Sequence, residues 1–151
     1  DFSRNTAPCY TTMQLLETLY QNDISRISTD RQHGILANTW LRPVEHDEML
    51  QTAEKISQLL QESETDKLLL SALVIGKLLP QTKEWLSTTY YKSLSELGLK
   101  KLARVLPENV FNRLSFEAVI TRAEAIGAVT FEVRNFTNDA DALRWLRGYG
   151  S

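Results

Sequence analysis

Short apolar stretches separated by polar turns characterise the first part of the chain. The segment 15–20 is a short apolar and aromatic stretch that predicts a first strand, and 23–29 and 35–40 are predicted as the next pair of strands. The segment Arg31-Gln32-His33-Gly34 separates the last two. A short polar connection that contains a glycine is typical of a hairpin turn. We therefore expect an antiparallel meander at the start of the fold.

Helix-like and strand-like patterns alternate along the rest of the chain. In 45–62 the apolar side chains recur with a helical period, at Met49, Ala53, Ile56 and Leu60. Further helices are predicted over 82–97, over 110–125 and from Asn138 to Gly148, and strands over 68–75, 101–106 and 129–134. The fold class is therefore α/β. We predict a mixed sheet, an antiparallel meander followed by parallel βα units, with about four helices packed on it.

The almost unbroken apolar run 68–75 predicts a central strand that is covered on both faces. We expect residues 1–14 to be a flexible N-terminal leader and residues 15–148 to form a single domain. The side chains that we expect to be largely buried are Ile56, Leu69, Ala72, Leu73, Leu86, Leu102, Val105, Phe131 and Val133.

Composition narrows the range of partners. Of the 151 residues, 42% are hydrophobic and 24% charged, with 17 basic against 19 acidic side chains. No basic block stands out, so we expect no nucleic-acid partner. The longest apolar run is far shorter than the ~20 residues of a membrane helix, and no signal-peptide pattern is present. We therefore expect no integral membrane segment and a cytoplasmic location.

The sequence carries no recognisable catalytic motif. A nucleophile elbow, a phosphate-binding loop and a dinucleotide fingerprint are all missing. The only histidines are His33, in the predicted turn, and His46, which lies between Glu45 and Asp47 at a helix start. Neighbouring helical residues point in different directions, so these three do not converge on a metal. We therefore expect binding rather than catalysis, with no metal and no cofactor.

Thr82 is the one candidate for a regulatory site. It stands at the predicted start of the helix that follows the central strand. A hydroxyl there most often caps the helix, but free N–H groups and the helix dipole would also stabilise a phosphate. We expect Thr82 to be accessible to solvent, with Gln81 and Lys83 beside it as possible partner-binding residues.

Five segments together carry a family resemblance. They are 19–23, 34–40, Gln81-Thr82-Lys83-Glu84-Trp85-Leu86, Leu97-Gly98-Leu99-Lys100-Lys101-Leu102-Ala103, and Val133-Arg134-Asn135-Phe136 leading to 142–146. In this order and spacing the chain resembles the STAS/SpoIIAA-like superfamily, in particular its small stand-alone bacterial members. The resemblance implies a mixed sheet with helices packed on it.

The best-known proteins of that superfamily are anti-sigma-factor antagonists, which dock on a partner protein. A kinase controls them at a Ser or Thr at the start of the helix after the central strand, usually in an Asp-Ser pair followed by a glycine. In this chain the pair and the glycine are both missing from 79–84. Only Thr82 is placed to take the phospho-acceptor role that the resemblance implies.

Two functions follow as expectations. The first is a non-enzymatic regulatory or scaffolding module that acts by protein–protein interaction, with an unknown protein or a second copy as partner. Such a module needs an exposed patch with few charges. The alternative is a small apolar-ligand or lipid carrier similar to CRAL-TRIO domains. A carrier needs an enclosed apolar cavity on the order of several hundred Å³.

Overall fold

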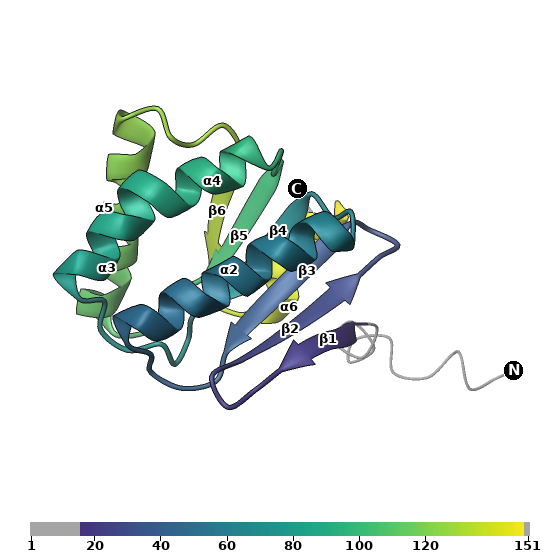
Figure 1. The fold of residues 1–151 in the computed structure, drawn as a ribbon, viewed down its shortest axis with the longest axis horizontal. Helices are drawn as coiled ribbons and strands as arrows, with labels where there is room; N and C mark the ends of the chain where they lie inside the picture. Colours follow the sequence, from purple (N-terminus) through teal and green to yellow (C-terminus); the bar gives the residue numbers. More distant parts are fainter. Residues whose placement is uncertain (1–15, 150–151) are drawn as a thin grey trace, which may run out of the picture.

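The computed structural model describes residues 16–149, which build a six-stranded mixed sheet with helices on both faces (Figure 1). The predicted leader, 1–14, lies outside the described residues. The strands are β1 (Glu17–Gln21), β2 (Ser25–Asp30), β3 (Ile35–Trp40), β4 (Lys67–Ser71), β5 (Lys101–Val105) and β6 (Glu132–Phe136). They lie in the sheet in sequence order.

The first three strands form the predicted antiparallel meander, and β3 to β6 are parallel. The turn between β2 and β3 ends at Gly34, whose φ is +70°. An added Cβ there would lie 3.2 Å from a carboxylate oxygen of Asp66. Glycine therefore suits the hairpin in both conformation and space. The predicted fold class is confirmed.

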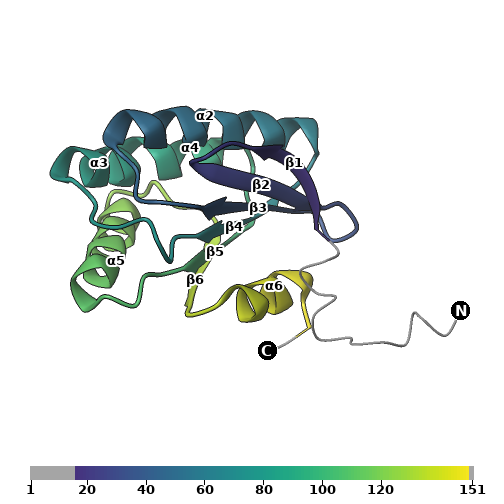
Figure 2. The same ribbon diagram turned by 90° about the horizontal axis from the view of Figure 1, so that it is seen from below.

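Helices cover both faces of the sheet, as the central strand required. One face carries α2 (His46–Glu62), α3 (Pro80–Trp85), the π-helical turn η2 (Leu86–Tyr90), α4 (Tyr91–Glu96) and α5 (Val110–Ala125). The other carries α6 (Asp139–Arg147). Figure 2 shows α2, α3 and α4 above the strands and α6 below them. No helix within residues 16–149 is long and apolar enough to cross a membrane.

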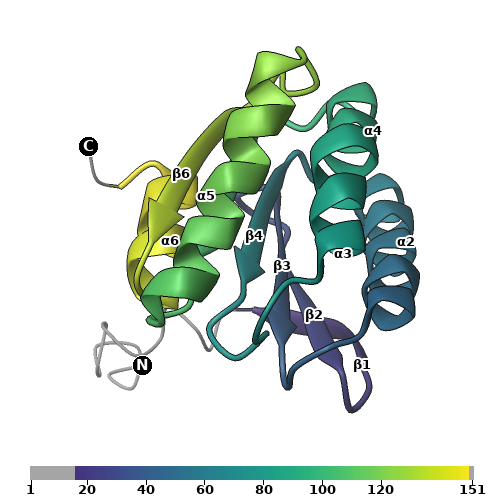
Figure 3. The same cartoon turned by 90° about the vertical axis from the view of Figure 1, so that its left-hand side faces the viewer.

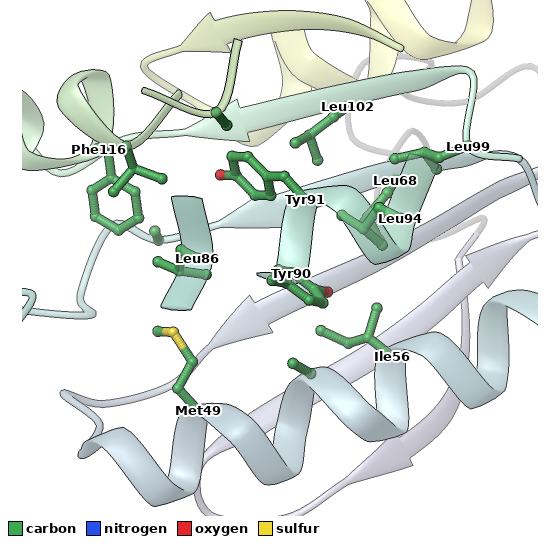
Figure 4. Packing of buried hydrophobic residues seen from close by; sticks show 14 of the residues in the cluster. Met49, Ile56, Leu68, Leu86, Tyr90, Tyr91, Leu94, Leu99, Leu102 and Phe116 are labelled. Atoms are coloured by element: carbon green, nitrogen blue, oxygen red, sulfur yellow. The ribbon is translucent and has the colours of Figure 1, made fainter. Parts of the chain in front are cut away.

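Each face of the sheet has its own apolar core. The larger core lies under α2, η2, α4 and α5, and Figure 4 shows its side chains interdigitating between helices and strands. The smaller core joins α6 to the other face of β3, β4 and β5. Leu68 belongs to the first core and Leu69 to the second. The two cores explain why β4 is apolar at successive positions rather than at alternate ones.

The second half of the predicted central strand is wrong. β4 ends at Ser71, and the next residues form a loop in which Leu73 is 41% exposed and Val74 is also exposed. The last paired residues of its neighbours are Thr39 and Val105. Because no strand pairs with the chain beyond that row, the apolar run leaves the sheet.

Most of the other expectations hold. Ile56, Leu69, Ala72, Leu86, Leu102, Val105 and Phe131 are buried, whereas Val133 is only partly buried. Val133 lies on β6, one of the two edge strands, which begins at Glu132 rather than at 129. The helices over 110–125 and after Asn138 are found as predicted. The predicted helix over 82–97 is divided into α3, η2 and α4.

The corrected end of β4 gives a prediction on stability. Leu69→Ala should lower the free energy of unfolding by about 2–5 kcal/mol, because it leaves a cavity in the core beside α6. Leu73→Ala should change it by less than about 0.5 kcal/mol, because the side chain is exposed. Urea unfolding of both variants measures the difference, and equal losses would contradict the observed end of the strand.

Candidate functional site

The structure buries Thr82, so the expectation of an accessible hydroxyl is wrong. Pro80 is the first residue of α3, and the helix therefore begins before Thr82 rather than at it. Thr82 lies within the first turn and is only 3% exposed. Gln81 is exposed and Lys83 partly buried, both on the same turn. The structure does not test whether these two residues bind a partner.

Thr82 joins two helices instead of facing solvent. Its Oγ1 lies 2.9 Å from Nδ1 of His46, the first residue of α2. A hydroxyl beside an imidazole is also the pairing of a nucleophile with a base. However, the cavity lined by Thr82 and its neighbours has a volume of only about 10 Å³. This space admits no substrate, and the pair is best explained as a contact that fixes α3 against α2.

The buried pair predicts the effect of charge at this position. Thr82→Glu should lower the free energy of unfolding by about 3 kcal/mol or more, because it places an unpaired carboxylate in the interior. Thr82→Val keeps the shape and loses only the hydrogen bond to His46, so about 1 kcal/mol is expected. Thermal and urea unfolding test both. Wild-type stability of Thr82→Glu would contradict the burial of this side chain.

Exposed apolar side chains gather at the end of the sheet where β4 and β5 terminate. Leu73 and Val74 follow β4, and Leu79 precedes α3. Val110, Phe111 and Leu114 begin α5, and Phe111 is 79% exposed. Helices α3 and α5 pack against each other. Figure 3 shows that both start at the end of the sheet where the loop after β4 lies. We call these six residues the apolar edge.

Helix α5 has two apolar sides. The side that packs on the core contains Phe116, Val119 and Ala123. At 3.6 residues per turn, the apolar-edge residues Phe111 and Leu114 lie on nearly the opposite side of the helix. Their exposure therefore does not follow from a poor fit of α5 to the sheet.

A second feature lies beneath η2 and α5, where Arg104 of β5 is 2% exposed. Its Nε donates to Oδ1 of Asn135 at 3.0 Å, and its Nη1 donates to the carbonyl oxygen of Phe116 at 2.9 Å and to the hydroxyl oxygen of Tyr91 at 3.3 Å. Within residues 16–149 Nη2 has no partner. All three acceptors are neutral, so this buried charge lacks a counter-charge among them.

Arg104 lines a cavity of about 30 Å³. The remaining walls are almost entirely apolar and come from Trp40, Met49, Ala53, Ile56, Leu70, Ala72, Ile75, Leu86, Tyr90, Tyr91, Leu106 and Phe116. A space of this size has room for a water molecule or two. It is far smaller than the enclosed cavity that a lipid carrier was expected to need.

A larger groove of about 380 Å³ runs along the outside, between α2 and the helix formed by α3, η2 and α4. Ala53 and Tyr90 line both the groove and the inner cavity. The Tyr90 ring stacks on Trp85 with centroids 5.2 Å apart, and its hydroxyl is buried without a partner within residues 16–149. Burial raises the pKa of Tyr90, so its hydroxyl keeps its proton.

A polar cluster occupies the opposite end of the sheet. Oδ2 of Asp30 accepts from Nε of Arg147 at 2.7 Å and lies 2.8 Å from Nδ1 of His33. These contacts hold the partly buried His33 in the hairpin turn, and its Nε2 lies 3.3 Å from the hydroxyl of Tyr149. This cluster joins the meander to α6. No group of three or more potential metal ligands occurs in the part of the chain that the structure describes.

The cluster predicts a loss of stability in acid. Burial acts to raise the pKa of Asp30, but hydrogen bonds and charge from Arg147 and His33 outweigh it and lower the pKa below its ordinary 3.8. The contribution of Asp30 is thus complete above about pH 4 and is lost as the pH falls through the lowered pKa.

Asp30→Asn should lower the free energy of unfolding at neutral pH by about 2 kcal/mol. It should also flatten the dependence of stability on pH below about pH 4. Urea unfolding of wild type and variant across this range measures both effects. Parallel curves would show that Asp30 does not supply this dependence.

Arg104 was missed from the sequence. It falls within the predicted strand over 101–106, where it shares one face with Leu102 and Leu106. The signal was available: a charged residue at an inward position of a strand flanked by helical patterns on both sides predicts a buried charge. The sequence alone does not reveal which groups meet that charge, because Tyr91, Phe116 and Asn135 come from three other elements.

Comparison with known proteins found no family model, no curated protein and no solved structure that matches this chain. The resemblance to STAS/SpoIIAA-like domains therefore stays a prediction.

Proposed function

We propose that the protein is a non-enzymatic regulatory or scaffolding module that binds a partner protein through the apolar edge. The observation that carries this proposal is the exposure of Phe111 together with Val110 and Leu114, on the side of α5 that faces away from the core. Exposed groups of apolar side chains on a folded protein mark interaction sites. Aromatic residues are enriched in such contacts.

The position of the apolar edge supports the same function. Its residues come from the loop after β4 and from the starts of α3 and α5, which rest on the ends of parallel strands. Loops and helix starts held on a rigid sheet are common places for recognition residues. The exposed Gln81 and the partly buried Lys83 adjoin this edge on α3. STAS-like domains, which the chain resembles, also act by docking on a partner.

In this function Thr82 does not serve as a phosphorylation switch, because its hydroxyl is buried against His46. The function also involves no catalytic step. The pairing of Thr82 with His46 has no space beside it for a substrate.

Site-specific photo-cross-linking tests the proposal. A photoreactive phenylalanine analogue at position 111 should give a discrete protein adduct in the native cell. The same analogue at Ile126, which is exposed at the far end of α5, serves as the matched control and should give none. Phe111→Asp should abolish formation of the same adduct from a cross-linker at position 114, with stability changed by less than about 0.5 kcal/mol.

Sedimentation of the purified protein distinguishes the partners. A dimer that Phe111→Asp converts to a monomer identifies a second copy as the partner, whereas a monomeric wild type with an adduct of higher mass identifies another protein. Equal adducts from positions 111 and 126, or none from either, would refute the proposal.

A further inference from the structure

Within the described part of the chain, the polar groups that line the inner cavity have unused hydrogen-bond donors. Nη2 of Arg104 only donates and has no partner within residues 16–149. The hydroxyl oxygen of Tyr91 accepts from Nη1 of Arg104, which leaves its proton to donate. The buried Tyr90 hydroxyl is also unpartnered in this part of the chain. Figure 4 shows the hydroxyl of Tyr91 on the side of Phe116 and that of Tyr90 on the side of Ile56.

We propose that this cavity binds the carboxylate of an apolar small molecule, with Arg104 as its counter-charge and the apolar chain in the groove beside α2. The proposal goes beyond the partner contact at the apolar edge and concerns different residues.

A negative ligand accounts for the arginine better than water does. An arginine side chain keeps its positive charge in a protein, and a buried charge is costly unless an opposite charge meets it. Water would supply an acceptor for Nη2 but no charge. A carboxylate supplies both, since its oxygens accept only, and the guanidinium group matches its geometry.

The surroundings favour a carboxylate on an apolar chain over a simple inorganic anion. Apart from Arg104 and the two tyrosine hydroxyls, the walls of the cavity consist mainly of hydrocarbon side chains. The cavity holds only the head of such a ligand, but Ala53 and Tyr90 separate it from the groove of about 380 Å³. A chain that passes between these two residues would lie along α2 toward Ser57, which lines the groove.

The wall between cavity and groove is also the least regular part of the helix. Tyr90 is the last residue of the π-helical turn η2, which interrupts the helix between α3 and α4. Short π-helical turns inside α-helices occur frequently at functional sites. The Tyr90 ring is held by stacking on Trp85, and a rotation of this pair would open the path from the groove to Arg104.

Calorimetric titration of the full chain with acetate, butyrate and octanoate tests the proposal. Octanol serves as the uncharged probe and sodium chloride as the simple anion. Octanoate should bind at least roughly tenfold more tightly than octanol, because only the carboxylate forms charge-assisted hydrogen bonds. Affinity should rise along the acid series by up to roughly fourfold for each methylene group that becomes buried.

Variants locate the two ends of the ligand. Arg104→Met keeps the approximate volume of the side chain and should weaken octanoate binding by roughly tenfold or more. Arg144→Met, the same change at an exposed position of α6, is the matched control and should leave binding unchanged. Tyr91→Phe removes one donor and tests the cavity if Arg104→Met does not fold. Ser57→Trp should block the groove and weaken octanoate more than acetate.

Three results would overturn the proposal. The first is an absence of octanoate binding. The second is octanoate binding of equal strength by wild type and Arg104→Met, or by wild type and Tyr91→Phe. The third is an equal response to chloride, acetate and octanoate, which would show a site for a simple anion without an apolar chain.

Discussion

The packing of the larger helical layer depends on a buried arginine. Arg104 projects from β5 into the space between sheet and helices, and its hydrogen bonds reach β6, α4 and α5 through Asn135, Tyr91 and Phe116. The bond to the Phe116 carbonyl matters most for geometry, because it ties the backbone of α5 to β5. A leucine at position 104 could fill space but could not fix the helices by directed bonds.

Among the described residues, this arrangement leaves buried polar atoms without hydrogen-bond partners on the sheet. Arg104 lies in one row across the sheet with Leu70 of β4 and Asn38 of β3. Both polar atoms of the Asn38 side chain are buried without partners within residues 16–149. Such atoms are uncommon in proteins, and each requires an explanation. The strands thus place unsatisfied polar groups where a layer of apolar side chains would be more stable, which is typical of a functional site rather than of a purely structural core.

The sequence predicted the elements better than it predicted their ends. The predicted bounds of β3 and α5 match the observed ones, because Gly34 and Pro43 lie close to the ends of the strand and Pro107 and Gly127 close to the ends of the helix. It failed at β4, since hydrophobicity continues from Leu70 into Leu73 and Val74 although the neighbouring strands have ended. The residue at which a strand ends is set by its pairing with neighbouring strands. The hydrophobic pattern of one segment does not show where that pairing stops.

The same limit applies to the candidate sites. Thr82 was expected at the surface because it was taken as the first residue of a helix, whereas Pro80 begins that helix and turns Thr82 inward. A difference of two residues rotates a helical side chain by about 200°. The hydrogen-bond partners of Arg104 could not be predicted from the sequence either. Asn135 lies beside Arg104 only because of the register in which β6 pairs with β5.

The two sides of α5 distinguish what folding requires from what it does not. Phe116, Val119 and Ala123 are the buried residues that attach the helix to the core. Phe111 and Leu114 lie on the other side of the helix and are large, apolar and exposed. Exposed apolar groups promote association between molecules. Their cost is this risk of association, and the packing of α5 on the core does not offset it. A partner surface that covered them, as proposed above, would remove this cost. Because the carbonyl of Phe116 accepts a hydrogen bond from Arg104, Phe111 and Leu114 stand on a helix whose position is fixed by the buried charge.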